Sequence, residues 1–451
     1  MQDEDAIQVN NGAYTNTVIK LLLGSWGPAA ARLLNIPIPR AWKDIAEAIP
    51  IPLNTDGNLI EEYTGMPGDI KIKQADVVLI NYPLDYQIST QIARNNLEYV
   101  SWSAERLKYY TNWFVKYALR NSPTGPQMTW STHSISEAQL QIAGCAAYTY
   151  LLYSIVPYVR PPFFQFSELI EDDASKNGGT EPAFPFLTGH GGYLQIFTHG
   201  LTGMRPHVDA LYLDPTLPPQ LGDGGVQVKG VKWRGAVFDI DIQLDRTNIY
   251  RRENIETSNS VASGGSVRIQ IGDNNPKGGN YSLGAGQSLI IPTRRPDLNM
   301  QGNHALCRPV SSDDEYMPGH FPLSVVDGSL SSVWQPTLSS KGASVTIDLG
   351  RHLEGLRRVD IGWGALPPEG FSISLRSSDA ESWKEVLRVG NVNISAPFEP
   401  YRAKEVRIVD SNRTVGVFDQ SHNGRYVKLL IWGTQDIDKA IGPTVGEFKI
   451  F

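Results

Sequence analysis

The residue types that can do chemistry are most concentrated in one short stretch, residues 125–145 (GPQMTWSTHSISEAQLQIAGC). This stretch holds an aromatic ring (Trp130), an imidazole (His133), a carboxylate (Glu137) and several hydroxyl groups. Such groups at the entrance of a buried helix suit a pocket for a hydroxyl-rich ligand. One hypothesis is therefore a binding or catalytic site built on this stretch.

The element that must position these groups is predicted to be a loop that runs into a helix. Pro126 favours the loop, and the spacing of Ile135 and Leu140 favours a helix with one buried face. A second interpretation needs no ligand, because Ser134 or Ser136 can cap a helix that has an acidic residue in its first turn. The segment alone leaves both interpretations open.

Composition and charge narrow the class of partner. The chain has 451 residues, enough for two or three domains, and 41% of them are hydrophobic, which is ordinary for a protein with sizeable cores. The formal net charge of -7 argues against nucleic acid or an anionic membrane surface, since either favours a basic face. No apolar run reaches about 18 residues, so we predict no membrane span. The opening MQDEDAIQVNNG lacks the layout of a signal peptide.

Cysteine and histidine usage predicts neither a disulfide framework nor a metal centre. Cys145 and Cys307 are too few for a zinc site and leave two alternatives, one bridge or two buried thiols. The eight histidines show no HExxH-type spacing, so we expect no catalytic metal and no cofactor. Three sequons begin at Asn280, Asn393 and Asn412 and are glycosylation acceptors if the chain is secreted, which we favour.

The first 212 residues are expected to be helical with long loops. Residues 12–26 predict an amphipathic helix that the Gly27-Pro28 pair stops. Residues 28–47 predict a second helix that is interrupted near Pro37 and Pro39. Two further stretches are assigned to the core: residues 77–80 and the aromatic-rich residues 102–118.

The remainder is expected to form two β domains, residues 213–304 and 305–451. After a Pro-rich linker, the sequence VQVKGVKWRGAVFDIDIQL alternates apolar and polar residues, which is typical of antiparallel sheet. Residues 267–271 and 288–291 continue this pattern toward a small β-sandwich. The C-terminal part has short apolar runs between Gly, Pro and Asp, which favours a β-sandwich or jelly roll. These runs are residues 344–349, 357–363, 371–375, 406–409 and 426–432.

Several segments, in one order along the chain, resemble glycoside hydrolase family 65 and in particular its fungal acid α,α-trehalases. The resemblance rests on KQADVVLINYPL (residues 73–84), GPQMTWS (residues 125–131) and FPFLTGHGGYLQ (residues 184–195), with a PPQL-then-strand join after them. It implies that residues 1–212 are the C-terminal part of an (α/α)6 catalytic barrel and that residues 213–304 are a β-sandwich cap.

Residues 305–451 resemble a discoidin or coagulation-factor C-type module. The fold class implied is therefore multidomain, α then β: a partial (α/α)6 barrel, a β-sandwich domain and a discoidin-like jelly roll. The resemblance rests on Asp327-Gly328, Trp334, Asp348-Leu349-Gly350, Trp363, Trp383 and Gly424-Arg425-Tyr426-Val427.

The resemblance implies an inverting hydrolysis of α,α-trehalose to two glucose units. That reaction uses one protonated carboxyl group and one carboxylate that activates water on the opposite face, roughly 6.5 to 9.5 Å apart. The opening Asp3-Glu4, followed by NGAYTN at residues 11–16, resembles the family's acid segment and implies Glu4 as the general acid. Asp5 stands where the family has tyrosine.

The catalytic base aligns with Gln139, the twelfth residue counted from Met128. An amide cannot take a proton from water, so this position as written can bind substrate but cannot activate water. Three explanations stay open: a substitution that traps substrate, a naturally inactive copy, or an alignment shifted by two that gives the role to Glu137. Positions 137 and 139 lie about 200° apart on a helix, so only one of them can face the pocket.

The resemblance also implies a set of sugar-binding residues without a metal. Lys73 and Gln74 resemble the pair that hydrogen-bonds the glucose being cleaved, and both offer donors that match sugar hydroxyls. Glycines can let backbone approach either a ligand or a neighbouring helix, and Trp130 can either stack on a sugar or pack in the core. The remaining candidates are Trp130, His133, Gly189 and Gly191.

Two rival functions remain, together with expectations about partners. A disaccharide phosphorylase of the same family would replace the base with a phosphate pocket, for which residues 132–136 supply an imidazole and hydroxyls. A non-catalytic carbohydrate-binding or cell-wall protein would use the loops of the C-terminal module.

We expect trehalose or a related α-glucoside as ligand. We also expect an upstream portion of the same polypeptide that completes the barrel, and a location outside the cell, in the cell wall or in the vacuole.

Overall fold

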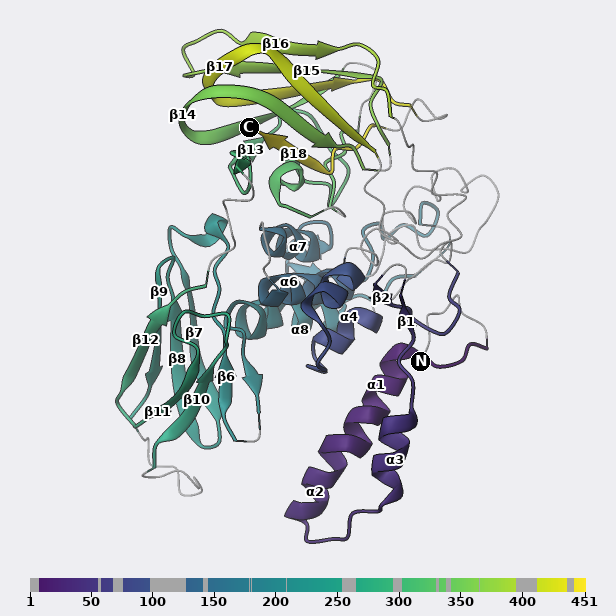
Figure 1. Cartoon of the computed structure of the whole chain (residues 1–451), viewed down its shortest axis with the longest axis vertical. Coiled ribbons are helices and arrows are strands. Elements are labelled where there is room, and N and C mark those ends of the chain that lie inside the picture. Colours follow the sequence, from purple (N-terminus) through teal and green to yellow (C-terminus); the bar gives the residue numbers. More distant parts are fainter. Residues whose placement is uncertain are drawn as a thin grey trace.

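The chain, seen in a computed structural model, forms a helical region followed by two β domains (Figure 1). This order confirms the predicted sequence of α then β. Several predictions concern residues that the structure does not describe. These are Glu4, Lys73, Gln74, residues 102–118 and residues 406–409. The structure describes residues 8–55, 58–67, 76–97, 127–140, 145–177, 179, 181–207, 209–253, 265–294, 302–329, 332–337, 342–364, 366–394, 412–435 and 442–451.

The N-terminal helices form a hairpin that extends away from the rest of the helical region (Figure 1). One arm runs without a break through α1 (Ala13–Leu21), the π-helical turn η1 (Leu22–Trp26) and α2 (Gly27–Leu33), and α3 (Ala41–Ala48) forms the other arm. The chain between the arms contains both prolines at which an interruption was predicted, and this prediction is confirmed.

The predicted helix stop at Gly27-Pro28 is wrong. The helix continues through Pro28, because the residues before it, Trp26 and Gly27, have right-handed helical φ and ψ and the π-helical turn η1 ends just before Pro28. A π-helical turn is one way in which a continuous helix accommodates a local irregularity in its hydrogen bonds. Gly27 instead serves packing, because a Cβ at this position would lie 2.8 Å from the ring of Trp42. Large apolar side chains remain exposed on the hairpin, among them Trp26, Leu33 and Leu34.

The central helices lie together (Figure 1), and their buried apolar residues form three clusters. Val77, Val78 and Ile80 are buried, which confirms that residues 77–80 belong to the core. The helices are α4 (Asp76–Asn81), α6 (Met128–Leu140), α7 (Ala146–Ile155), α8 (Leu187–Gln195) and the π-helical η2 (Ile196–Leu201). Two short strand pairs lie beside them, β1 (Leu53–Asn54) with β2 (Leu59–Ile60) and β3 (Val159–Arg160) with β4 (Gln165–Phe166).

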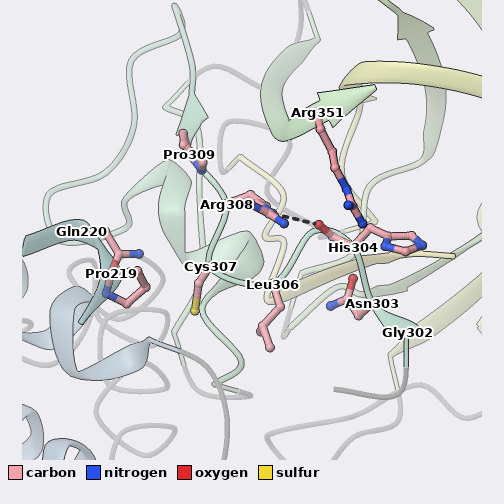
Figure 2. A pocket seen from close by; sticks show the side chains of 10 residues that line it. All are labelled: Pro219, Gln220, Gly302, Asn303, His304, Leu306, Cys307, Arg308, Pro309 and Arg351. Atoms are coloured by element: carbon pink, nitrogen blue, oxygen red, sulfur yellow. Dashed lines mark hydrogen bonds between the residues drawn. The ribbon is translucent and has the colours of Figure 1, made fainter. Parts of the chain in front are cut away.

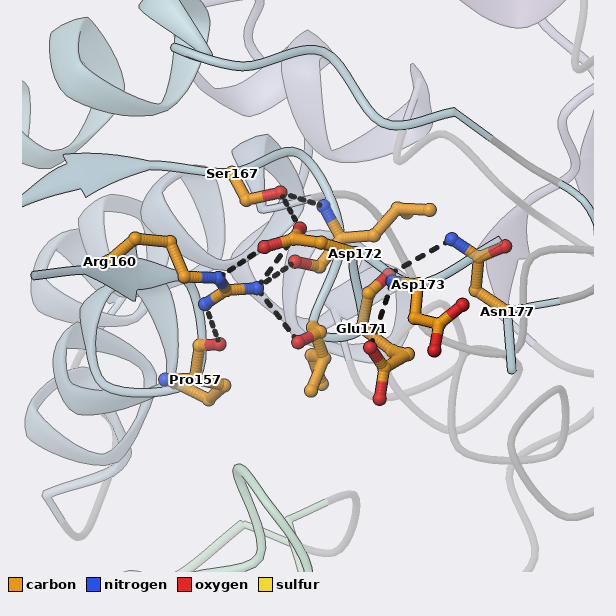
Figure 3. A network of polar contacts seen from close by, with 9 residues as sticks. Pro157, Arg160, Ser167, Glu171, Asp172, Asp173 and Asn177 are labelled. Atoms are coloured by element: carbon orange, nitrogen blue, oxygen red, sulfur yellow. Dashed lines mark hydrogen bonds and ion pairs between the residues drawn. The ribbon is translucent and has the colours of Figure 1, made fainter. Parts of the chain in front are cut away.

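A polar network centred on Arg160 holds the long connection between α7 and α8 (Figure 3). The guanidinium donates to the carbonyl oxygens of Pro157, Leu169 and Ile170 at 2.8–2.9 Å and to the carboxylate of Asp172. Ser167 donates to the same carboxylate at 2.5 Å. One side chain thus ties four points of the connection together.

The β-sandwich consists of two four-stranded sheets with an apolar interior. Strand β8 shows the predicted alternation directly, because every second residue from Ala236 to Ile242 is buried. One sheet has the order β11 (Gly279–Leu283), β10 (Val267–Ile271), β6 (Leu211–Leu213), β5 (Arg205–Pro206). The other has the order β12 (Ser288–Pro292), β9 (Arg246–Arg251), β8 (Ala236–Ile242), β7 (Val226–Trp233), and a short helix η3 (Pro219–Leu221) precedes it. The first sheet thus includes strands that precede residue 213.

The C-terminal domain is a six-stranded sheet built on two long strands, β14 (Ala343–Gly362) and β17 (Arg413–Trp432). The predicted runs 344–349 and 357–363 lie in one strand, β14, because glycines with positive φ at Gly350 and Gly355 and several register shifts let it bend without ending. The other strands are β13 (Val310–Ser311), β15 (Gly370–Arg376), β16 (Lys384–Val389) and β18 (Glu447–Ile450), and a short helix η5 (Pro322–Val326) precedes β14.

A disulfide between Cys145 and Cys307 joins the helical region to the start of the C-terminal domain. The Cα atoms are 5.8 Å apart, and the two residues are separated by 162 positions in sequence. Of the two alternatives left open by the sequence, the structure therefore has the bridge. Within the described residues, none of the helices has the length and apolar character needed to cross a membrane.

Candidate active site

Helix α6 lies in the interior and begins at Met128, earlier than the capping hypothesis required. Ser134 and Ser136 are therefore in the middle of the helix, and the prediction that one of them caps it is wrong. Ser134 Oγ donates to the carbonyl oxygen of Ala147 in α7 at 2.8 Å. Ser134 is thus bound to a neighbouring helix, and it is not available to hold a phosphate.

Trp130 and His133 are core residues. The ring of Trp130 is 1% exposed and stacks on Tyr153 with a centroid distance of 4.1 Å, while its Nε1 donates to the hydroxyl oxygen of Tyr158 at 2.8 Å. His133 is completely buried, and its Nδ1 lies 2.8 Å from the carbonyl oxygen of Thr129. Neither ring has a face open to a ligand, so the structure favours the core alternative over the predicted sugar contacts.

The glycines of α8 divide by what they face. A Cβ on Gly189 would lie 2.3 Å from Gln127 Oε1, and one on Gly192 would lie 2.3 Å from Ser131 Oγ. These two glycines let α8 approach α6 closely, which is the helix-packing alternative. Gly191 has no atom within 4 Å of such a Cβ position. Of the two glycines proposed to bind sugar, only Gly191 leaves open space beside it.

Gln139, the position aligned with the base, is half-buried near the end of α6 and accepts hydrogen bonds from two side chains. Arg205 donates to its Oε1 at 2.6 Å, and Asn81, the last residue of α4, donates to the same atom at 3.4 Å. Arg205 is itself 5% exposed. The amide oxygen is therefore fixed by a buried cation.

A second arginine holds the end of α6. Arg294, which follows β12, donates to the carbonyl oxygens of Ala138 at 2.9 Å and Gln139 at 3.1 Å. Its guanidinium also forms a buried ion pair with Asp214 at 3.3 Å. A cation at these last carbonyls satisfies backbone groups that the helix leaves unpaired and complements the helix dipole. The β-sandwich thereby sets the position of Gln139.

Aromatic and titratable groups surround Arg205. Its guanidinium carbon lies 4.7 Å from the ring centroid of Tyr82, whose hydroxyl donates to Gln195. Burial raises the pKa of Tyr82 to about 12, although Arg205 opposes this shift. Burial, and then the charge of Arg205, lower the pKa of His199. Burial raises the pKa of Asp214 even though Arg294 opposes it.

This cluster offers many hydrogen-bond donors and few groups that can take a proton. Its amides and guanidinium suit hydroxyl oxygens, whereas the Gln139 amide cannot serve as a base. Glu137 is buried, at 8% exposed. In the described part of the chain, no group of three His, Cys, Asp or Glu side chains is placed to hold a metal. Glu4, the residue proposed as the acid, lies outside the described residues, so its separation from Gln139 stays a prediction.

The residues that fix Gln139 were missed in the sequence. Arg205 lies 66 positions from Gln139 and Arg294 lies 155 positions away, so no local spacing connects them. The sequence offers one signal for Arg205. This cation stands directly before a proline and follows a stretch of small and apolar residues (GLTGMRPH). Asp85, which pairs with His207 at 3.2 Å and acts electrostatically on Arg205, was equally unmarked.

Comparison with family models and with solved structures gives little information about this chain. No family model matches the chain. Chitosan-binding module 1 from a chitosanase/glucanase of Paenibacillus sp. IK-5 aligns with 33% of this chain and 98% of that chain, at 16% identity and a TM-score of 0.27. A TM-score this low carries no conclusion about fold or ligand.

Comparison with known sequences is more informative. The acid trehalase of Emericella nidulans is 33% identical over 99% of this chain and 43% of its own length. The cell wall acid trehalase of Arthroderma benhamiae is 34% identical over 83% of this chain and 34% of its own length. A protein-glucosylgalactosylhydroxylysine glucosidase of Danio rerio is 30% identical over 68% of this chain and 41% of its own length. The chain spans less than half the length of these relatives. By sequence, it belongs to the trehalase-like glycoside hydrolases.

Proposed function

We propose that this protein has the site of an inverting acid/base hydrolase that cleaves α,α-trehalose to two glucose units, with the base position substituted by Gln139. The observation that carries the proposal is the similarity to acid trehalases over nearly the whole chain. In this mechanism Glu4 donates a proton to the leaving oxygen, and position 139 directs the attacking water from the other side of the sugar. Lys73 and Gln74 hold the glucose that is cleaved.

The surroundings of position 139 support a role for a carboxylate there. A glutamate with the same reach would place its oxygen where Arg205 now donates at 2.6 Å. An arginine this close lowers the pKa of a carboxyl group, so such a base stays ionised in acid. A hydrolase that works in acid needs a base of this kind. The glutamine in this chain keeps the hydrogen bonds and loses the proton acceptor.

The first experiment compares Gln139→Glu with the unchanged protein and with Gln139→Met. Glucose release from trehalose is measured with and without added phosphate, and thermal melting checks that each variant folds. We expect Gln139→Glu to raise kcat about 100-fold or more, since general base catalysis contributes about 10²–10⁴-fold. Gln139→Met should stay at the level of the unchanged protein.

Two results would contradict this assignment. A folded Gln139→Glu variant with an unchanged rate would remove position 139 from the chemistry, and a loss of activity in Glu137→Gln would then assign the role to Glu137. A reaction that requires phosphate would instead identify a phosphorylase. Of the groups proposed for that alternative, Thr132 donates to the carbonyl oxygen of Thr129 at 2.8 Å, and the others, His133, Ser134 and Ser136, are buried. We therefore expect no such requirement.

We also propose that the protein acts outside the cell or in the cell wall. Its relatives include proteins named as cell wall and periplasmic/secreted acid trehalases. A disulfide is typical of oxidising compartments. The sequon residues Asn280 and Asn393 are exposed, whereas Asn412 is 6% exposed and donates to the carbonyl oxygen of Gly364 at 2.5 Å. Glycan binding through the loops of the C-terminal domain belongs to the same proposal.

A further inference from the structure

A separate pocket lies between the C-terminal domain and the segment that leads into it (Figure 2). Its volume is about 540 Å³, a size that suits a small ligand. Its walls come from three places: the segment 302–309, the β14 residue Arg351, and Pro219 and Gln220 of η3. None of these residues belongs to the cluster around Gln139.

The pocket is lined by basic groups without acidic ones. His304, Arg308 and Arg351 line it, and among its described lining residues there is no Asp or Glu. Figure 2 shows the side chains of Arg308 and Arg351 extending toward His304. Burial, then Arg351 and then Arg308 lower the pKa of His304, which agrees with the closeness of the three groups.

The charges of the two arginines are not neutralised by ion pairs. Arg308 Nε donates to the carbonyl oxygen of His304 at 3.4 Å, a neutral partner. Asp348 is close enough to interact electrostatically with Arg308, but both of its oxygens accept from Arg425 at 2.8 Å. Within the part of the chain that the structure describes, neither Arg308 nor Arg351 forms an ion pair with a carboxylate. The pocket therefore retains positive charge.

Asn303 adds an amide donor of fixed orientation to these cations. It lines the pocket and is 6% exposed. Its Oδ1 accepts from the backbone N–H groups of Ala305 at 3.0 Å and Ile450 at 3.2 Å. These two bonds fix the orientation of the amide, and Nδ2 has no hydrogen-bond partner among the described residues. Nδ2 is therefore open to an acceptor in the pocket.

The backbone that carries these groups is held rigidly. Cys307, next to Arg308, forms the disulfide with Cys145, and its N–H donates to the carbonyl oxygen of Val326 at 2.8 Å. The N–H of Arg308 donates to the carbonyl oxygen of Ala305 at 3.0 Å. The backbone next to the pocket is thus fixed before a ligand arrives, while the side chains of Arg308 and Arg351 are exposed.

We propose that this pocket binds a tetrahedral oxyanion, a phosphate or sulfate group, carried by a molecule the size of a single sugar. Two guanidinium groups, an imidazole and an amide supply donors to several oxygens of one such group, and guanidinium groups form paired hydrogen bonds with it. The remaining volume accommodates a hexose. The proposal does not depend on the reaction at position 139.

The experiment is isothermal titration calorimetry on the full chain. The probes are glucose 6-phosphate, inorganic phosphate, inorganic sulfate and, as the neutral control, glucose. We expect saturable binding of the oxyanions, no binding of glucose, and a rise in Kd with salt. Tighter binding of glucose 6-phosphate than of phosphate indicates a sugar-borne group, and equal binding indicates the free ion.

Variants test whether the binding occurs in this pocket. Arg308→Gln and Arg351→Gln should each weaken glucose 6-phosphate binding by about tenfold or more, the effect of one charge-assisted pair. Arg388→Gln removes the same charge from β16, outside the pocket, and should leave Kd unchanged. Melting curves confirm that all three variants fold. The proposal is overturned if no oxyanion binds saturably, or if Arg388→Gln weakens binding as much as the two pocket variants.

Discussion

His133 illustrates how burial decides what a residue type can do. The imidazole was a candidate for binding sugar or phosphate, yet it lies between the rings of Trp130 and Tyr150, with centroid distances of 5.7 and 5.3 Å. Burial lowers its pKa to about 4, against the opposing effect of hydrogen bonds to backbone at Thr129 and Leu97. The side chain is therefore neutral over the range in which free imidazole takes up a proton.

This shift makes the free energy of unfolding depend on pH. The unfolded imidazole binds a proton below pH 6.5 and the folded one only near pH 4, so stability is lost as the pH falls between these values, by roughly 3 kcal/mol. His133→Asn keeps a donor near Thr129 and removes the titration. Urea unfolding near pH 7 and near pH 4 should show a smaller loss in the variant. Equal losses in both proteins would show that His133 does not cause the dependence.

Single residues were predictable from the sequence where their chemistry is local. The resemblance implied Gln139 at the base position, which stays a prediction, and the absence of a proton acceptor there follows from its amide alone. Its partners Arg205 and Arg294 were not predictable, because they reach it from strand ends far along the chain. The sequence left open whether Trp130 and His133 bind a ligand or pack in the core, because residue type does not reveal which side of a helix is covered.

At the scale of elements, the packing of α8 on α6 depends on glycine. Gly189 and Gly192 occupy positions where a Cβ would meet α6 or the segment just before it, and Gly200 in η2 also lies close to α6, with Ile135 Cα at 3.3 Å from the corresponding Cβ position. Gln127, which Gly189 faces, is completely buried and donates to the carbonyl oxygen of Ser154 at 2.5 Å. The glycines therefore determine how closely these helices approach.

Gly189→Ala should destabilise the protein, and Gly191→Ala should not. The first change forces a methyl group against Gln127, and overpacking of this kind costs about 1–3 kcal/mol. The second places a methyl group in open space within a helix, where alanine is favoured by about 0.5–1 kcal/mol. Denaturant unfolding measures both values. A Gly189→Ala variant as stable as Gly191→Ala would contradict the close approach described here.

Element types followed from periodicity more readily than element ends. The alternation at residues 236–242 predicted β8 because one face of that strand packs on the core. The stop at Gly27-Pro28 failed because the helix continues through a π-helical turn just before the proline. The continuity of β14 was hidden because its polar, glycine-containing middle reads as a turn.

At the scale of the whole molecule, one covalent link joins parts that are distant in sequence. The disulfide between Cys145 and Cys307 connects the start of α7 to the entry of the C-terminal domain, and the loop that it closes contains the entire β-sandwich. The sequence left this pairing open, since two cysteines alone do not reveal their distance. A link across so long a loop restricts the unfolded chain strongly.

Cys145→Ala with Cys307→Ala should lower the free energy of unfolding by roughly 2–5 kcal/mol. Denaturant unfolding in the absence and presence of a reducing agent measures the effect. The reducing agent should destabilise the unchanged protein and leave the double variant unaffected. A double variant as stable as the unchanged protein would show that the noncovalent contacts between these parts are sufficient.

The same bond determines what a single backbone cleavage does to this protein. A protease that nicks the chain anywhere between Cys145 and Cys307, including in the β-sandwich, produces two polypeptides that stay covalently attached. The cut protein would migrate as one species until a thiol separates the fragments. The C-terminal domain would thus remain tethered to the helices even in a clipped molecule.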